Sequence, residues 1–177
     1  ALEGGYQPDR LYFCPDILPE AALRELPGLE GCPLVSLSPD VYRHLAYRGK
    51  TEGVIGLMHS KAHSLEDLVL KSEAPLILVA EAPEKPGNIG ALLRTADAAG
   101  LDAVIIADPR GDLYNPNVIR SSVGCVFTVQ VATAGSAEVL GFLKEQGIQV
   151  LAAALGDSTR YDLVDYKGPT AIVVGTE

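Results

Sequence analysis

Hydrophobic positions in the second part of the chain follow two alternating patterns. Residues 75–80 form a continuous apolar run, which is typical of a strand buried on both faces. Residues 88–99 repeat their apolar positions at helical spacing, and Gly100 follows as a stop signal. Further strands are predicted at 103–107, 126–131, 148–155 and 170–174, and a second amphipathic helix at 136–146. Strands that alternate with helices predict an α/β fold with a parallel sheet.

The first part of the chain is shorter and less regular. Short strands are predicted at 10–14, 33–37 and 53–59, and Ser38 followed by Pro39 marks a helix start between the last two. We therefore expect a small N-terminal α/β domain at residues 1–65, a linker at 66–73 and a larger domain at 74–177. The sequence opens without Met and stops directly after an apolar strand, so we expect a fragment that lacks its last C-terminal elements.

Composition narrows the class of protein. Of the 177 residues, 47% are apolar and 21% are charged, as in globular proteins. No apolar run approaches the roughly 18 residues that a membrane span needs, so we expect no membrane segment. The three cysteines, Cys14, Cys32 and Cys125, are odd in number and widely spaced. This pattern disfavours a disulfide framework and a zinc site, and it favours the reducing cytoplasm.

The charge of the chain is unevenly distributed. A net charge of −9 argues against nucleic acid binding by the chain as a whole. Residues 41–63, however, contain Arg43, Arg48, Lys50 and Lys61, all three histidines and only one acid, Glu52. This segment is either a local basic patch or an ordinary solvated surface, and the sequence alone favours neither.

Candidate chemistry lies in the loops that follow the predicted strands, because open α/β sheets bind ligands beyond the carboxyl ends of their strands. In the loop 81–90, Gly87 and Gly90 would allow an anion to approach the start of the next helix. Asn88 either binds a substrate or caps that helix. Arg94 either reaches the mouth of the loop or is an exposed solubilising residue. Arg120, beside two serines, suits a phosphate contact, although ordinary turn chemistry explains it equally well.

Two nucleotide-binding motifs are absent from the sequence. Neither the phosphate-binding G-x-x-x-x-G-K-[ST] nor the dinucleotide fingerprint G-x-G-x-x-G occurs. Gly87 and Gly90 nevertheless lie at a strand–helix junction, and Asp108 follows the next strand, where a ribose-binding acid would fall. An NAD(P)-dependent dehydrogenase therefore remains an alternative. All three histidines precede residue 65, so neither a Ser-His-Asp triad nor a metal centre is expected.

Taken in order, these loops resemble one family. Residues 86–96, PGNIGALLRTA, resemble the first motif, N-x-G-x-x-x-R, of the SpoU (TrmH-type) RNA 2′-O-ribose methyltransferases of the SPOUT superfamily. The motif residues are Asn88, Gly90 and Arg94. Residues 120–124 are similar to the R-x-S-x-G stretch that follows, and 172–177 look like the start of the second motif, G-[ST]-E. The first 65 residues resemble the family's small substrate-binding domain.

The resemblance implies a fold, a cofactor and partners. It implies a SPOUT methyltransferase domain with a C-terminal trefoil knot, whose third motif would lie beyond Glu177. The implied cofactor is S-adenosyl-L-methionine, and the implied substrate is RNA, which we expect to be ribosomal RNA. Such enzymes are usually homodimers, and we expect a cytoplasmic protein that needs neither a metal nor a membrane.

The resemblance also assigns residues to roles. The implied catalytic residues are Asn88, Arg94 and Glu177. The implied cofactor-binding residues are Ala153, Leu155, Gly175 and Thr176. The implied RNA-binding residues are Arg43, Arg48, Lys50, Arg120 and Ser122.

The chemistry of the guanidinium group limits the role of Arg94. Proposals for the family make this arginine a general base, but a guanidinium group stays protonated under ordinary conditions. We therefore expect Arg94 to hold a phosphate and to stabilise developing charge. A catalytically inactive RNA-binding protein of the same fold remains a second alternative.

Overall fold

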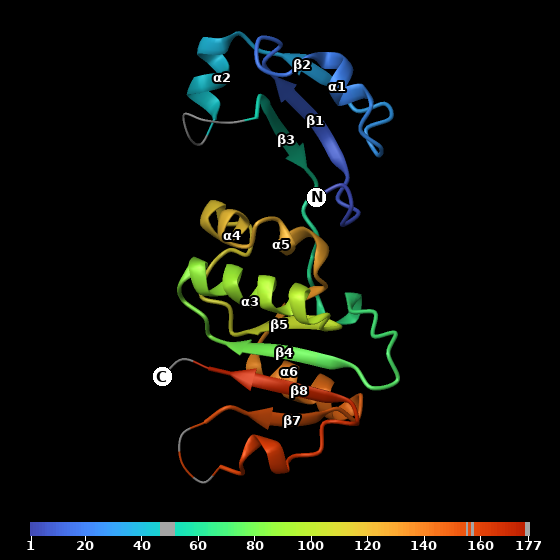
Figure 1. Cartoon of the computed structure of the whole chain (residues 1–177), viewed down its shortest axis with the longest axis vertical. Helices are drawn as coiled ribbons and strands as arrows, with labels where there is room; N and C mark the ends of the chain where they lie inside the picture. Colours follow the sequence, from blue (N-terminus) through green and yellow to red (C-terminus); the bar gives the residue numbers. More distant parts are fainter. Residues whose placement is uncertain (47–51, 155, 157, 176–177) are drawn as a thin grey trace. The chain divides into compact units, whose positions relative to one another are not determined.

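The computed structural model describes residues 1–46, 52–154, 156 and 158–175 (Figure 1). The chain divides into two compact units, Ala1–Lys61 and Ala62–Glu177. This division lies four residues before the end of the small domain expected from the sequence. The reason is that residues 62–65 pack on the second unit: the His63 Nδ1 lies 2.9 Å from the carbonyl oxygen of Val131, and Leu65 joins the core of that unit.

The first unit is a three-stranded sheet with two short helices. The strand order is β2-β1-β3, with β2 parallel and β3 antiparallel to β1. Its elements are β1 (Pro8–Phe13), α1 (Glu20–Arg24), β2 (Leu34–Ser36), α2 (Pro39–Leu45) and β3 (Val54–Met58). Helix α2 begins where the sequence predicts, because the Ser38 side chain accepts the Val41 N–H. Leu11, Phe13, Leu23 and Leu29 form the core.

The second unit contains a larger parallel sheet with helices on both faces. Its first elements are η1 (Leu65–Asp67), β4 (Leu76–Glu81), α3 (Pro86–Ala99), β5 (Ala103–Ala107), α4 (Pro116–Ser121) and α5 (Cys125–Thr128). The remaining elements are β6 (Val131–Ala134), α6 (Ser136–Glu145), β7 (Gln149–Ala152), η2 (Tyr161–Leu163) and β8 (Thr170–Val174). The predicted α/β fold with a parallel sheet is confirmed.

The order of the five strands creates a point where the chain changes direction across the sheet. The order is β6-β5-β4-β8-β7, and every neighbouring pair is parallel. The chain runs outward from β4 through β5 to β6, then crosses to β7 and returns to β8 beside β4. The switch point therefore lies between β4 and β8, and such points are where open α/β sheets bind ligands.

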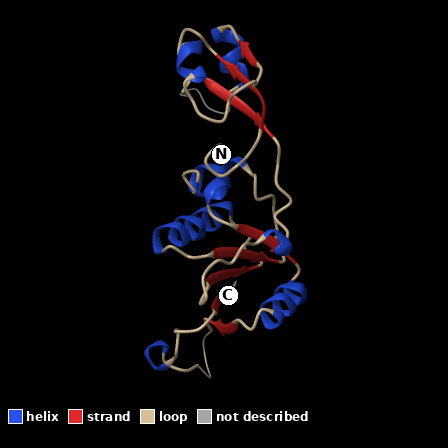
Figure 2. Cartoon of the chain, turned by 90° about the vertical axis from the view of Figure 1, so that its right-hand side faces the viewer, coloured by secondary structure: helices blue, strands red, loops and turns tan. Residues whose placement is uncertain are grey.

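Helices lie on both faces of this sheet (Figure 2), and each face has its own apolar core. Helix α3 buries Ile89 and Leu93 on one face, together with Val118 of α4 and Val126 of α5. Helix α6 packs on the other face together with η1. Among the described residues, no helix combines the length and apolar character that crossing a bilayer requires.

One predicted strand is wrong. Residues 126–131 read as a strand because β-branched and aromatic side chains favour strands. Instead, Cys125–Thr128 forms the short helix α5, and β6 begins only at Val131. Gly124 turns the chain with φ +93°, and Val126 is then fully buried in the core beside α3. Burial of one side chain in this core outweighs local strand propensity.

Candidate active site

A cleft of about 770 Å³ opens at the switch point of the sheet. The ends of β4 and β8 and the first turns of α3 form its walls. The lining residues are Ala80, Glu81, Pro83, Glu84, Lys85, Asn88, Ala91, Leu92, Thr95, Val174 and Gly175. The volume is within the range of small-molecule sites, about 300–1,000 Å³. Gly175 of the predicted second motif and Asn88 of the first therefore line the same cleft.

The start of α3 presents Asn88 to this cleft. The helix begins with Pro86 after the extended residue Lys85, and no side chain caps this end. The interpretation of Asn88 as a helix cap is therefore not supported. Its side chain is exposed and lies on the same helix face as Leu92 and Thr95.

The other glycine of the first motif has a packing role. A Cβ atom on Gly90 would lie 2.0 Å from the Oγ of Ser121 and 2.6 Å from its carbonyl carbon. Gly90 is thus the point where α3 touches α4. A Cβ atom on Gly87 would meet no atom within 4 Å among the described residues. The expectation that both glycines let an anion approach is therefore wrong for Gly90, which is closed by α4.

Arg94 is exposed, as expected, but it does not line the cleft. It follows Asn88 by six residues, which places it about 120° around the helix. It faces towards α5: burial raises the pKa of the Cys125 thiol, Asp97 raises it further, and the positive charge of Arg94 opposes the rise. Asn88 and Arg94 therefore occupy neighbouring faces of one helix.

The two residues expected to contact RNA near the end of α4 differ in their exposure. Arg120 is exposed in the last turn of α4. Ser122 is fully buried, and its hydroxyl donates to the carbonyl of Ile119 at 2.9 Å. The Ser122 hydroxyl is therefore not available to contact RNA, whereas the Arg120 side chain is accessible. Val123 follows with φ +54°, an unfavourable conformation for a β-branched residue, and its side chain is 75% exposed.

Two of the four residues expected to bind the cofactor, Gly175 and Ala153, lie at the same edge of the sheet. Gly175 directly follows β8, and a Cβ atom there would lie 3.4 Å from the Oε2 of Glu81. Ala153 directly follows β7, and its N–H donates to the carbonyl of Val173 at 2.9 Å. Arg48, Lys50, Leu155, Thr176 and Glu177 lie outside the described residues.

In the first unit, Arg43 is exposed and already has an acidic neighbour. Its Nη2 lies 2.5 Å from the Oδ1 of Asp40, and its Nε donates to the carbonyl of Pro39 at 3.1 Å. An exposed pair of this kind is weak, so Asp40 lowers the availability of Arg43 for a phosphate without abolishing it.

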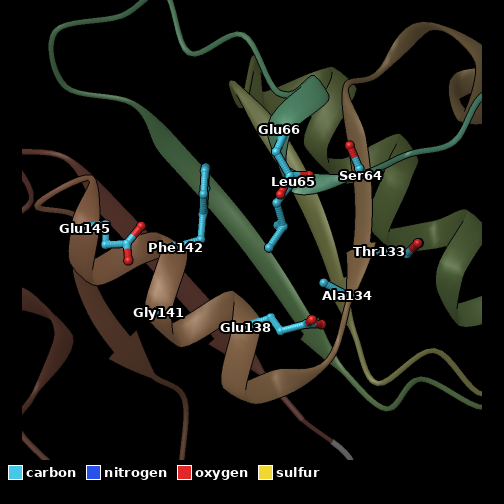
Figure 3. Close-up of a pocket in the computed structure, with 9 residues that line it drawn as sticks. All are labelled: Ser64, Leu65, Glu66, Thr133, Ala134, Glu138, Gly141, Phe142 and Glu145. Carbon is cyan, nitrogen blue, oxygen red and sulfur yellow. The ribbon is translucent and has the colours of Figure 1, made fainter.

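A second hollow lies on the α6 face of the sheet (Figure 3). Its volume is about 490 Å³, and it is bordered by η1, β6 and α6. Three carboxylates line it, those of Glu66, Glu138 and Glu145. None of the motif residues borders it, and its negative charge disfavours phosphate groups. The cleft of Asn88 and Gly175 is therefore the better candidate.

Comparison with known proteins identifies the family. Residues 75–177, more than half of the chain, match the SpoU rRNA Methylase family, and they include every described residue that lines the cleft. The chain belongs to this family.

Relatives of this SpoU-family chain extend the similarity to the first unit. The chain is 28% identical over 181 residues to 23S rRNA (guanosine(2553)-2′-O)-methyltransferase RlmP of Bacillus subtilis, covering 99% of this chain and 71% of that protein. It is 40% identical over 116 residues to the 23S rRNA (guanosine-2′-O-)-methyltransferase RlmB of Pseudomonas aeruginosa, covering 64% of this chain but only 46% of that protein. The crystal structure of an RNA 2′-O ribose methyltransferase superposes with a TM-score of 0.76 at 34% identity, covering 99% of this chain and 67% of that one.

The dehydrogenase alternative requires Asp108 to bind a ribose, but in this SpoU-family chain the Asp108 side chain is already bonded. The carboxylate of Asp108 accepts hydrogen bonds from the hydroxyl of Ser136 at 2.5 Å and from its N–H at 3.2 Å. The Ser136 side chain, and then its N–H, hold the pKa of Asp108 below its usual range. Asp108 thus binds the start of α6 and is not free to hold a ribose. Among the described residues, no group of three or more His, Cys, Asp or Glu side chains is arranged to hold a metal ion.

Glu81 is not among the site residues predicted from the sequence, yet its side chain lines the cleft beside Gly175. Its position carries a recognisable signal, because a carboxylate ends an otherwise apolar, buried strand. Nothing in the sequence shows that β8 brings Gly175 next to it.

Proposed function

We propose that the full-length protein transfers a methyl group from S-adenosyl-L-methionine to a ribose 2′-hydroxyl of ribosomal RNA. The observation that carries this proposal is the cleft at the switch point, where Asn88 of the first family motif and Gly175 of the second meet. Relatives named as 23S rRNA 2′-O-methyltransferases support RNA as the substrate class.

The cleft fits the cofactor in size and chemistry. It combines apolar side chains, such as Leu92 and Val174, with polar groups from Asn88 and Glu81. Gly175 leaves open the space that a side chain would fill. Gly175 and Ala153 would hold the cofactor, together with Leu155 and Thr176. When bound, S-adenosyl-L-methionine supplies an electrophilic methyl group on a cationic sulfur.

The protein's part in the reaction is positioning and charge stabilisation. A ribose hydroxyl is a poor nucleophile, so it must be held in line with the methyl group and away from bulk water. The cofactor would supply the methyl group, and the hydroxyl proton would pass to water or to an RNA phosphate. Asn88 would orient the hydroxyl in the cleft. Arg94, on the neighbouring face of α3, would hold an RNA phosphate and stabilise developing negative charge, and Glu177 would orient one of these two residues.

RNA would also be held by local basic residues, since the chain as a whole is acidic. We assign this role to Arg43, Arg48 and Lys50 of the first unit and to Arg120 of the second. Replacing the first three with Ala should weaken RNA binding and flatten its salt dependence by up to about one unit of log–log slope for each phosphate that the variant no longer neutralises. An unchanged slope would mean that this surface is only solvated.

We further assign the protein to the cytoplasm, where its RNA substrate is, and expect it to act as a homodimer. Sedimentation of the full-length protein tests the dimer. A single species with the mass of one chain at micromolar concentration would rule the dimer out.

The central experiment measures cofactor and product together. Calorimetry of the full-length protein should show binding of S-adenosyl-L-methionine and none of NADH. Mapping of 2′-O-methylation should find a ribosomal RNA position that loses its methyl group in cells lacking the gene. NADH binding without S-adenosyl-L-methionine binding would overturn the proposal. RNA binding without any methyl transfer would indicate an inactive RNA-binding member of the family instead.

A further inference from the structure

Glu81 lines the candidate cleft. It is the last residue of β4, the middle strand of the sheet, and it is half-buried. Ala80, which precedes Glu81 on β4, pairs with Val174, which precedes Gly175 on β8. Glu81 and Gly175 are therefore neighbours at the point where the two strands end. The distance of 3.4 Å from the Glu81 Oε2 to the position of a Gly175 Cβ atom confirms that the carboxylate lies over the glycine.

Within the described residues, no ion pair or hydrogen bond engages the carboxylate of Glu81. The ion pairs there are Arg24–Glu20, Arg43–Asp40 and Arg160–Asp162. The comparable carboxylate at the end of the neighbouring strand, Asp108, is bound by Ser136. The oxygens of Glu81 reach solvent, since no buried side-chain oxygen or nitrogen of the described residues lacks a hydrogen-bond partner. A carboxylate that lines a cleft and is not bonded by the fold is available to a ligand there.

The sign of this charge restricts the ligand. RNA phosphates are anionic, so a carboxylate in this position repels them. S-adenosyl-L-methionine carries one net positive charge, from its sulfonium and amino groups against its carboxylate. The product S-adenosylhomocysteine has lost the sulfonium charge and is neutral overall. Among the groups that the reaction brings to the cleft, the cofactor before transfer is the one that a carboxylate favours.

We propose that Glu81 is a specificity-determining residue that makes the cleft discriminate between the cationic cofactor and its neutral product. This inference rests on the proposed function. The Glu81 carboxylate stabilises the sulfonium form electrostatically, and the stabilisation ends when the methyl group leaves, which favours release of the product. Gly175 contributes by leaving the space between the strand ends open, so that the ligand can approach Glu81.

The test compares the affinities of the two ligands in the full-length protein. Glu81→Gln keeps the size of the side chain and an acceptor oxygen but removes the charge. We expect it to weaken binding of S-adenosyl-L-methionine by about tenfold, the scale of one charge interaction near solvent, and binding of S-adenosylhomocysteine by less than about twofold. Calorimetric titration with each ligand measures both values, and a thermal melt checks that the variant is folded.

Glu145→Gln is the matched control, because Glu145 is exposed on α6, on the opposite face of the sheet, and its replacement removes the same charge from the chain. It should change both affinities by less than about twofold, since remote exposed charges are screened. An equal loss for both ligands in Glu81→Gln would overturn the inference, as would unchanged affinities or an equal effect of Glu145→Gln. If the unaltered protein bound neither ligand, the proposed function would itself fail. If it bound both and the variants did not discriminate, only the inference about Glu81 would fail.

Discussion

Helices α3 and α6 both start at the carboxyl edge of the same parallel sheet, but their first turns are completed differently. At α6, the Glu138 carboxylate accepts the N–H of Gly135 at 2.9 Å. Asp108, from a different strand end, accepts the N–H and the hydroxyl of Ser136. At α3, the helix begins with Lys85 and Pro86, and no side chain caps it.

The two helix starts at this edge of the sheet therefore have different roles, one in ligand binding and one in stability. Where the protein supplies its own carboxylates, the helix start is closed and contributes stability. Where it does not, the start of α3 remains beside a cleft that contains Asn88 and the unengaged Glu81. Substitutions of exposed side chains on α3 should therefore alter ligand binding or catalysis, whereas substitutions near the start of α6 should alter stability.

The largest expected effect is at Arg94. It is exposed on α3 and buries no core volume, so Arg94→Ala should change the free energy of unfolding by no more than about 0.5 kcal/mol. Methyl transfer should nevertheless fall at least about a hundredfold, the scale seen when a preorganised electrostatic donor is removed. Arg94→Lys should restore little, because a point charge lacks the planar grip of a guanidinium on phosphate.

Single-turnover methylation of the RNA substrate, paired with a denaturant melt, measures both quantities. Lys144→Ala provides the control, because it removes one exposed positive charge from α6 on the opposite face of the sheet. It should leave methyl transfer within about twofold of the unaltered protein, as expected for a screened, remote charge. Near-normal turnover of a folded Arg94→Ala protein would remove Arg94 from the mechanism.

A smaller effect, on stability, is expected from the two glycines of α3. Gly90→Ala would push a methyl group into Ser121 of α4, whose backbone cannot yield as a side chain can. We expect a loss of about 2–3 kcal/mol in the free energy of unfolding, as for other overpacked sites. Gly87→Ala meets open space at the exposed start of the helix and should stay within about 0.5 kcal/mol.

Urea unfolding of the two variants gives the comparison directly. Equal stabilities would show that α3 and α4 can separate without cost, and the contact at Gly90 would then not define that face of the helix. A selective effect of Gly87→Ala on cofactor or RNA affinity, with stability unchanged, would add the start of α3 to the ligand site.

The sequence predicted the features that depend on local patterns. The helical spacing of Ile89, Leu93 and Ala96 identified α3, and the apolar runs identified four of the five strands of the larger sheet within a few residues. The N-cap at Ser38 was also confirmed. Each of these follows from residues that are neighbours in sequence.

What the sequence could not predict depends on contacts between distant residues. The helix at Val126 exists because that side chain is buried beside α3, and no local rule reveals this. The packing role of Gly90 depends on its contact with Ser121. The hydrogen bond of Asp108 depends on Ser136, 28 residues further on. The pairing of Glu81 with Gly175 likewise needs the strand order. Motif residues pointed to the cleft, but the sheet determined which of them line it.

The smallest expected effect concerns the closed start of α6. Ser136 lowers the pKa of Asp108 in the folded protein, whereas an unfolded Asp titrates near its usual value of about 3.9. A group with a depressed folded pKa stabilises the protein fully above the unfolded pKa, and this stabilisation disappears as the pH falls through the folded value.

Asp108→Asn keeps one acceptor for Ser136 but no charge, so it should lower the urea midpoint slightly at pH 7. The difference from the unaltered protein should shrink as the pH falls below about 4, while S-adenosyl-L-methionine affinity at pH 7 stays unchanged. A difference that grew in acid would show that the ionised Asp108 does not stabilise α6, and a loss of cofactor affinity would show that the two helix starts are not functionally separate.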